Sequence, residues 1–144
     1  MLAAMPGRNA PIALIWKIKL FSGLSDKELG AVAEPFQNES FEPGTVVVEE
    51  GTTGSGFFVM ESGKAMVSVR GQELRELGPG DHFGEIALIA DSPRTATVTA
   101  VTSLRCHTIS RADFRRIVET QPSIAWKLLE NLARDFVSLR QSVD

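Results

Sequence analysis

The 144-residue sequence contains one cysteine, Cys106, so it can form no internal disulfide and offers no cysteine cluster for a metal. Cys106 lies in an alternating apolar stretch, which indicates a buried, unreactive thiol. The net charge of −3 argues against nucleic acid as a partner of this chain alone. No stretch approaches the roughly 20 apolar residues of a membrane span, since Lys17 and Lys19 close the run at residues 12–16. These absences favour a cytoplasmic protein without a membrane segment.

The length and the 43% hydrophobic content are typical of one globular domain. Residues 1–11 carry proline, glycine and alanine, which predicts a flexible N-terminal tail ahead of a domain at 12–144. Helices are expected within about residues 12–34. The best marked of them runs from 26 to 34, because Ser25 and Glu28 have the spacing of a capping box.

Residues 36–110 are rich in valine, threonine and phenylalanine, and glycine-containing turns separate the short runs. Period-two alternation marks strands at 65–69 and 95–101, and roughly eight strands at this spacing indicate an antiparallel jelly roll or barrel. Two helices are expected over about 111–141, the first capped by Ser110 and the second beginning near Pro122. The fold class is therefore α+β. A stripe on the last helix is expected to be packed: Ile124, Leu128, Leu132 and Phe136.

Residues 83–98, Phe-Gly-Glu-Ile-Ala-Leu-Ile-Ala-Asp-Ser-Pro-Arg-Thr-Ala-Thr-Val, interrupt the β pattern. Helix formers after Gly84 predict one short turn that is not stable alone. Its dipole and the free amides at its start would attract an anion; these amides belong to Gly84, Glu85, Ile86 and Ala87. Gly84 lets a ligand approach the backbone closely, and Arg94 can reach the same anion with its planar set of donors.

Glu85 is unexpected beside an anion, because its carboxylate would repel a phosphate. It fits if it accepts a hydrogen bond from a neighbouring hydroxyl, and the 2′-hydroxyl of a ribose is such a donor. Loss of that bond would leave a charge unpaired, so Glu85 would select ribose over deoxyribose. The pattern therefore predicts a ribose phosphate rather than free phosphate as the ligand.

The segment at 83–98 resembles the phosphate-binding cassette of the cyclic-nucleotide-binding domain family, which occurs in cyclic-nucleotide-dependent kinases, channels and bacterial regulators. The resemblance covers about residues 14–140 and includes Phe21-Ser22-Gly23-Leu24-Ser25, Pro43-Gly44, Ser62-Gly63, Gly80-Asp81 and the helix at Pro122. It implies that Glu85, with Gly84, binds the ribose 2′-hydroxyl. It also implies that the cyclic phosphate is held by Arg94, Thr95 and the amides of Ile86 and Ala87.

The same resemblance implies that the last helix covers the base. Candidate base contacts are Arg134, Phe136 and Leu139 on that helix, Val67 and Leu74 in the sheet, and Thr95; the apolar ones fit an ordinary core equally well. Thr95 can donate to phosphate or accept from the 2-amino group of guanine. Bacterial cAMP binders of the family also carry serine or threonine at this position, so cAMP is the expected ligand and cGMP the alternative.

We expect a ligand-operated sensor rather than an enzyme, with the ligand moving the C-terminal helix toward the base and an unknown protein effector reading that movement. Homodimerisation through this helix is possible. One alternative is the sensor part of a cAMP-responsive transcription regulator or of another fused effector. A minor alternative is a cupin-like metal enzyme, suggested by Asp81, His82 and Glu85. It is disfavoured because the only other histidine, His107, lies in a different strand, and His82 fits a loop position at the pocket rim.

Overall fold

The computed structural model describes residues 6–54 and 56–143. The chain forms two compact units, a β unit of residues 35–115 and a helical unit whose described residues are 6–34 and 116–143. None of the helices in the described ranges combines the length and apolar character needed to cross a membrane. The β unit holds the segment at 83–98.

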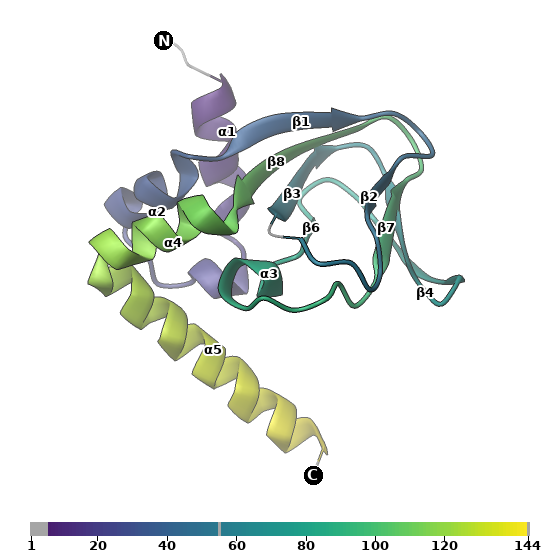
Figure 1. The fold of residues 1–144 in the computed structure, drawn as a ribbon. Coiled ribbons are helices and arrows are strands. Elements are labelled where there is room, and N and C mark those ends of the chain that lie inside the picture. Colours follow the sequence, from purple (N-terminus) through teal and green to yellow (C-terminus); the bar gives the residue numbers. More distant parts are fainter. Residues whose placement is uncertain (1–5, 55, 144) are drawn as a thin grey trace. The chain divides into compact units, whose positions relative to one another are not determined.

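The β unit consists of two four-stranded antiparallel sheets (Figure 1). The first has the order β1-β8-β3-β6, and the second has the order β2-β7-β4-β5. The strands are β1 (Gln37–Phe41), β2 (Val46–Val48), β3 (Gly56–Ser62), β4 (Ala65–Val69), β5 (Gln72–Leu77), β6 (His82–Phe83), β7 (Thr97–Ala100) and β8 (Leu104–Ser110). The expected α+β jelly roll is confirmed, and the strand predicted at 65–69 has the predicted bounds.

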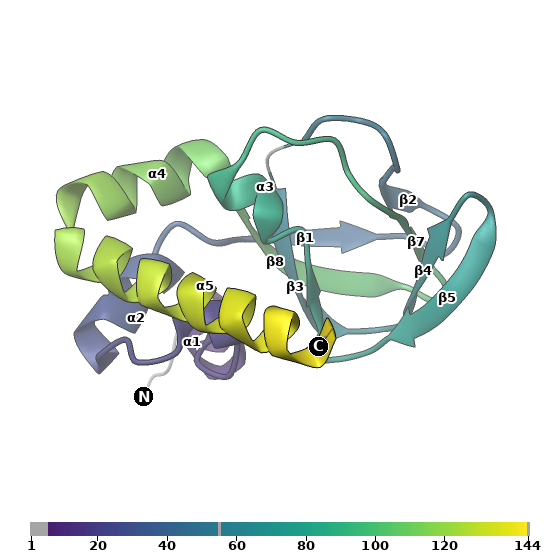
Figure 2. The ribbon, with the colours of Figure 1, turned by 90° about the horizontal axis from the view of Figure 1, so that it is seen from below.

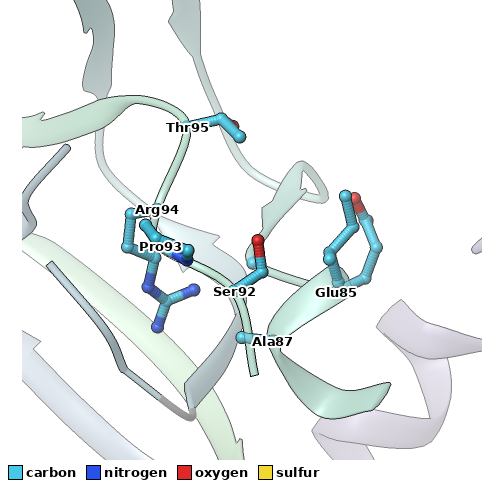
Figure 3. Close-up of a pocket in the computed structure, with 8 residues that line it drawn as sticks. Glu85, Ala87, Ser92, Pro93, Arg94 and Thr95 are labelled. Atoms are coloured by element: carbon cyan, nitrogen blue, oxygen red, sulfur yellow. The ribbon is translucent and has the colours of Figure 1, made fainter. Parts of the chain in front are cut away.

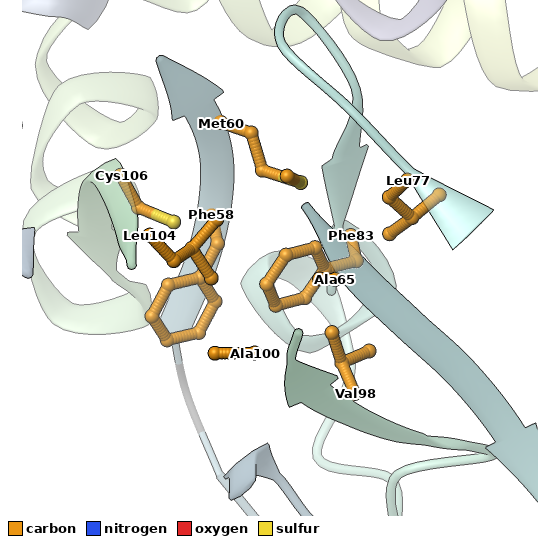
Figure 4. Packing of buried hydrophobic residues seen from close by; sticks show 9 residues of the cluster. All are labelled: Phe58, Met60, Ala65, Leu77, Phe83, Val98, Ala100, Leu104 and Cys106. Atoms are coloured by element: carbon orange, nitrogen blue, oxygen red, sulfur yellow. The ribbon is translucent and has the colours of Figure 1, made fainter. Parts of the chain in front are cut away.

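Large apolar side chains from both sheets form the core of the β unit (Figure 4). Phe58 of β3 and Phe83 of β6 stack with ring centroids 5.0 Å apart. Because Phe83 directly precedes Gly84, this stacking fixes the point at which the cassette leaves the sheet. The cluster comprises Phe58, Met60, Ala65, Leu77, Phe83, Val98, Ala100, Leu104 and Cys106. Cys106 is thus buried, as its alternating surroundings predict.

The helical unit contains α1 (Pro6–Ile15), the 3₁₀ turn η1 (Lys19–Phe21), α2 (Asp26–Ala33) and α5 (Pro122–Val143). The chain passes from the β unit into it through α4 (Arg111–Thr120). The capping box of α2 is confirmed, since the Glu28 amide donates to the Ser25 hydroxyl (3.2 Å) and the Ser25 amide to the Glu28 carboxylate (2.8 Å). The Asp113 amide likewise donates to the hydroxyl of Ser110 at the start of α4 (3.1 Å).

The expected tail at residues 1–11 is wrong for residues 6–11, which belong to α1; residues 1–5 lie outside the described residues. A proline is well tolerated in the first turn of a helix, where its missing N–H would have no partner. Pro6 therefore fits the helix start. Pro11 lies further inside α1 and is buried, so packing offsets the hydrogen bond that it cannot make.

Polar contacts join α5 to the N-terminal segments, along which it runs in Figure 2. The Glu28 carboxylate of α2 accepts hydrogen bonds from Ser123 (2.7 Å) and Lys127 (2.6 Å) of α5. The buried side chain of Asn131 donates to the carbonyl oxygens of Leu20 and Ser22, both at 2.8 Å. These contacts lie within the first half of α5.

The apolar stripe of α5 is packed only in that half. Ile124 and Leu128 are buried, whereas Leu132 is 38% and Phe136 59% exposed. The expectation of a fully packed stripe is therefore wrong beyond Asn131. The periodicity of a helix fixes which side chains share a face, but not how far along the helix that face is covered.

Candidate functional site

The cassette, residues 83–98, leaves the sheet at Gly84, where β6 ends, and continues into the single turn α3 (Ile86–Ile89). Gly84 has φ +90°, a conformation that side-chain-bearing residues rarely adopt. The amide of Ala87 donates to the carbonyl oxygen of Gly84 (3.1 Å). The expectation of a free Ala87 amide is therefore corrected, because the first turn is tight enough to close an i→i−3 bond.

The backbone of Arg94 is anchored to the segment before β3. Its amide donates to the carbonyl oxygen of Thr52, and its carbonyl oxygen accepts from the amide of Gly51, both at 2.8 Å. The guanidinium Nη2 donates to the carbonyl oxygen of Gly56 (2.9 Å). The Arg94 side chain is thus held at a fixed place beside the cassette.

Partial burial lowers the pKa of the Arg94 guanidinium through desolvation. Its one side-chain hydrogen bond within the described ranges goes to a neutral carbonyl oxygen, and no carboxylate there pairs with it. A partly desolvated cation without a counter-ion favours a bound anion.

A pocket lies between α3 and the segment that contains Arg94, as Figure 3 shows with Arg94 and Glu85 on opposite sides of it. It is lined by Gly84, Glu85, Ile86, Ala87, Ser92, Pro93, Arg94 and Thr95. An adjoining hollow shares four of these residues and extends toward the sheets; it is lined by Val48, Val67, Arg75, Leu77, His82, Phe83, Gly84, Glu85, Arg94, Thr95, Ala96 and Val98. The two together place the charged side chains of Glu85 and Arg94 next to apolar side chains of the sheets such as Val67.

The structure brings together the six cassette residues that the sequence indicates: Gly84, Glu85, Ile86, Ala87, Arg94 and Thr95. Of the expected base contacts, Val67 and Thr95 line the adjoining hollow. Leu74 is 58% exposed and is not among the residues that line either hollow. Its neighbour Arg75 lines the hollow instead, because successive side chains of a strand point to opposite faces.

The remaining candidate base contacts lie on α5 in the helical unit. Phe136 and Leu139 are 59% and 66% exposed, and Arg134 donates a hydrogen bond to the side-chain oxygen of Asn131. Their contact with a base remains a prediction.

Arg75, Ser92 and Arg111 are pocket-related residues that the sequence analysis missed. Arg111, the first residue of α4, donates through Nε to the carbonyl oxygen of Ala87 (3.0 Å). Its Nη2 lies 3.5 Å from the carboxylate of Asp91, just beyond α3. The only feature of the sequence that could have pointed to Arg111 is its position directly after the helix cap at Ser110. The contacts join the cassette to the start of α4.

His82 lies at the pocket, as expected, but in a strand rather than in a loop. It lies in β6 and lines the hollow, and its Nδ1 is 2.7 Å from Oε2 of Glu85. No group of three histidine, cysteine, aspartate or glutamate side chains among the described residues could hold a metal ion. The structure therefore adds no support to the cupin-like alternative.

A jelly roll with one short helix holds a cation that has no carboxylate partner among residues 6–54 and 56–143, and a carboxylate lies across the same pocket. This arrangement is typical of a module that binds a small anionic ligand. The model of the cyclic nucleotide-binding domain matches residues 38–121, and the chain belongs to this family. It is a regulatory domain rather than a catalytic one.

Two curated relatives illustrate the range of the family. The cAMP-dependent protein kinase regulatory subunit of Eremothecium gossypii is 40% identical over 100 residues, which are 69% of this chain and 22% of that protein. The cGMP-dependent protein kinase of Plasmodium berghei is 36% identical over 112 residues, 77% of this chain and 13% of that protein. The chain therefore spans less than a quarter of the length of these two relatives.

Solved structures share the fold. The N-terminal domain of a transcriptional regulator from Streptomyces coelicolor has a TM-score of 0.83 and 25% identity, covering 90% of this chain and 93% of its own. The catabolite activator protein of Thermus thermophilus has a TM-score of 0.69 and 27% identity, covering 88% of this chain and 62% of its own.

Proposed function

We propose that this chain is a cyclic-nucleotide sensor, with cAMP as its ligand. The observation that carries the proposal is the state of Arg94, a partly desolvated cation that faces a pocket and has no carboxylate partner in the described ranges. A cyclic phosphate supplies the missing negative charge. Arg, with several donors in one plane, is well suited to phosphate oxygens.

Glu85 is proposed to accept the hydrogen bond of the ribose 2′-hydroxyl from across the pocket, beside Gly84. Thr95 and the amide of Ile86 complete the phosphate contacts. The amide of Ala87 takes part only if it shares its hydrogen with the ligand or releases the Gly84 carbonyl oxygen. The base then extends into the adjoining hollow toward Val67.

A second candidate ligand is cGMP, and one observation favours it. Arg75 and Thr95 both line the hollow, and arginine and hydroxyl groups match the acceptors and the amino group on guanine. Relatives named for each nucleotide match the chain at similar identity. We retain cAMP as the first proposal and treat the ratio of the two affinities as the deciding quantity.

The response to ligand is proposed to pass from α3 to α4 and on to α5, which would then cover the base with Arg134, Phe136 or Leu139. Arg111 supports the first step, because it donates to the carbonyl oxygen of Ala87 within α3 and lies 3.5 Å from Asp91 just beyond α3. A ligand shifts the equilibrium between the open and the covering arrangement of α5 only by the difference between its affinities for the two. A protein effector, a fused domain such as a DNA-binding one, or a second copy at α5 would read the shift. We place the sensor in the cytoplasm.

Isothermal titration calorimetry with cAMP, cGMP and 5′-AMP tests the proposal. We expect a cyclic nucleotide to bind and 5′-AMP to bind more weakly. Arg94→Ala should weaken binding by about 2–5 kcal/mol, as for the loss of a partly buried charged partner. Arg105→Ala is the matched control, because Arg105 is an exposed arginine of the same unit that lines neither hollow.

Two results would contradict the proposal. Absence of binding by both cyclic nucleotides at millimolar concentration would exclude the sensor function. Equal affinity in wild type and Arg94→Ala would show that the phosphate is held elsewhere.

A further inference from the structure

The ribose-reading carboxylate has a titratable neighbour within the same hollow. Nδ1 of His82 lies 2.7 Å from Oε2 of Glu85, and the two side chains are 31% and 40% exposed. The contact is electrostatic rather than a hydrogen bond, because Nδ1 has no hydrogen-bond partner among the described residues. It is an attractive ion pair only when the imidazole is protonated.

The imidazole is held in place by its surroundings. Its ring centroid lies 5.7 Å from that of Phe57, a fully buried residue of β3. Within β6 the backbone of His82 pairs with Val59 of β3. The ring therefore stays beside Glu85, and what can change at this place is its charge.

The other charged groups around His82 set the direction of the effect. Arg75 and Arg94 line the same hollow and disfavour a further positive charge, whereas Glu85 favours it. On β3, Glu61 lies 2.6 Å from His107 of β8 and so has its own partner.

Two further acidic groups lie nearby in the sequence and the fold. The carboxylate of Asp81 accepts a hydrogen bond from the amide of Gly78 (2.7 Å). Asp91 lies 3.5 Å from Arg111, beyond the other end of α3. Glu85 is thus the acidic group with a described contact to the imidazole.

We propose that His82 is a positioning residue for Glu85, and that its protonation strengthens the recognition of the ribose 2′-hydroxyl. This inference rests on the proposed function. The protonated imidazole holds Oε2 of Glu85 and leaves the other carboxylate oxygen free for the ribose. A bound cyclic phosphate neutralises Arg94, which removes one cation that opposes the protonation of His82. Ligand binding and protonation therefore reinforce each other.

Recognition of the ribose is strongest when the imidazole is protonated and weakens when a higher pH removes that proton. A pair that is about one-third exposed has a modest effect, of about two- to fivefold in affinity.

The experiment compares cAMP with 2′-deoxy-cAMP by calorimetry at pH 5.5 and pH 8.0, using the full chain. The ratio of the two affinities isolates the contribution of the ribose 2′-hydroxyl. It does not respond to changes that weaken the binding of both ligands alike. In the wild type we expect the affinity for cAMP divided by that for 2′-deoxy-cAMP to be about two- to fivefold lower at pH 8.0 than at pH 5.5. His82→Asn and His82→Phe, the latter keeping a ring against Phe57, should make the ratio independent of pH. A ratio with the wild-type pH dependence in both variants would overturn the proposal.

An NMR titration of the histidine ring protons in the ligand-free chain separates this question from the proposed function. The chain has two histidines, so the signals can be assigned with His82→Asn. Glu85→Gln should change the pH dependence of the His82 ring-proton signals, because the ring then lies beside a neutral amide instead of a carboxylate. An unchanged pH dependence would overturn the positioning role whether or not a nucleotide binds. Absence of nucleotide binding together with a changed pH dependence would instead overturn the proposed function, and with it the role of the pair in ribose recognition.

Discussion

Arg94 occupies the space that a Cβ atom on residue 84 would need: such an atom would lie 2.6 Å from Nη1 of Arg94 and 2.7 Å from the carbonyl oxygen of Gly56. Gly84 is therefore required by the close approach of Arg94 as well as by its own φ of +90°. The glycine and the arginine, ten positions apart, build one feature of the pocket.

Gly84→Ala is expected to weaken cyclic-nucleotide binding at least about tenfold and to lower the free energy of unfolding by about 1–3 kcal/mol, because it combines backbone strain with a clash. Calorimetry and urea unfolding measure the two effects. Gly80→Ala is the matched control, since Gly80 also has φ +90° but has nothing within 4 Å of its would-be Cβ atom. Equal loss of affinity in the two variants would show that strain alone, and not the position of Arg94, is responsible.

Thr95→Ala is expected to reduce the affinity for cGMP by about two- to tenfold, the loss of about one hydrogen bond, and to reduce the affinity for cAMP less. The physical reason is that only guanine offers a 2-amino group to the hydroxyl oxygen. Competition binding with both nucleotides measures the ratio. Arg75→Met keeps the aliphatic part of the side chain and tests whether the Arg75 guanidinium contacts guanine. Equal losses for both nucleotides with Thr95→Ala would mean that Thr95 contacts the phosphate alone.

Glu28 is expected to make the chain sensitive to acid. Hydrogen bonds from Lys127, from the Ser25 backbone and from Ser123 lower the pKa of the Glu28 carboxyl from 4.5 to about 2. Since the folded pKa is below the unfolded one, the stabilisation is complete above about pH 4.5 and is lost as the pH falls toward 2. Its size is on the order of 3 kcal/mol.

Unfolding by urea at pH 7, 4 and 3 measures this contribution. Glu28→Gln should be less stable at pH 7 and should lose less stability on acidification than the wild type. Glu130→Gln, at an exposed position of α5, is the control. Parallel pH profiles for wild type and Glu28→Gln would show that the contacts with α5 contribute nothing to stability.

Cys106 is expected to resist thiol reagents in the folded chain. Desolvation, and secondarily the charge of Glu39, raise the pKa of the Cys106 thiol to about 12, so almost no thiolate exists at pH 8. Labelling with Ellman's reagent at pH 8 should be slow in buffer and fast in 6 M guanidinium chloride. Fast labelling of the folded chain would indicate that the β-unit core opens readily.

Local sequence patterns determined a large part of this protein. The Ser25–Glu28 capping box, the bounds of the strand at 65–69 and the cap at Ser110 could be predicted because each depends on residues at most a few positions apart. The cassette could be predicted for a similar reason, since its residues lie between 83 and 98 and their chemistry indicates an anion and a hydroxyl together.

The tertiary structure decided what depends on direction and on distant partners. It placed Arg75 rather than Leu74 in the hollow, because the register of β5 sets which face each side chain takes. It joined Glu28 to Lys127 across 99 positions, and it left Leu132, Phe136 and Leu139 of α5 exposed. Periodicity gives a helix its faces, and a motif gives a site its donors. Contacts between residues far apart in the sequence decide which face of a helix is covered and which side chain lies beside a donor, and these contacts form only in the folded chain.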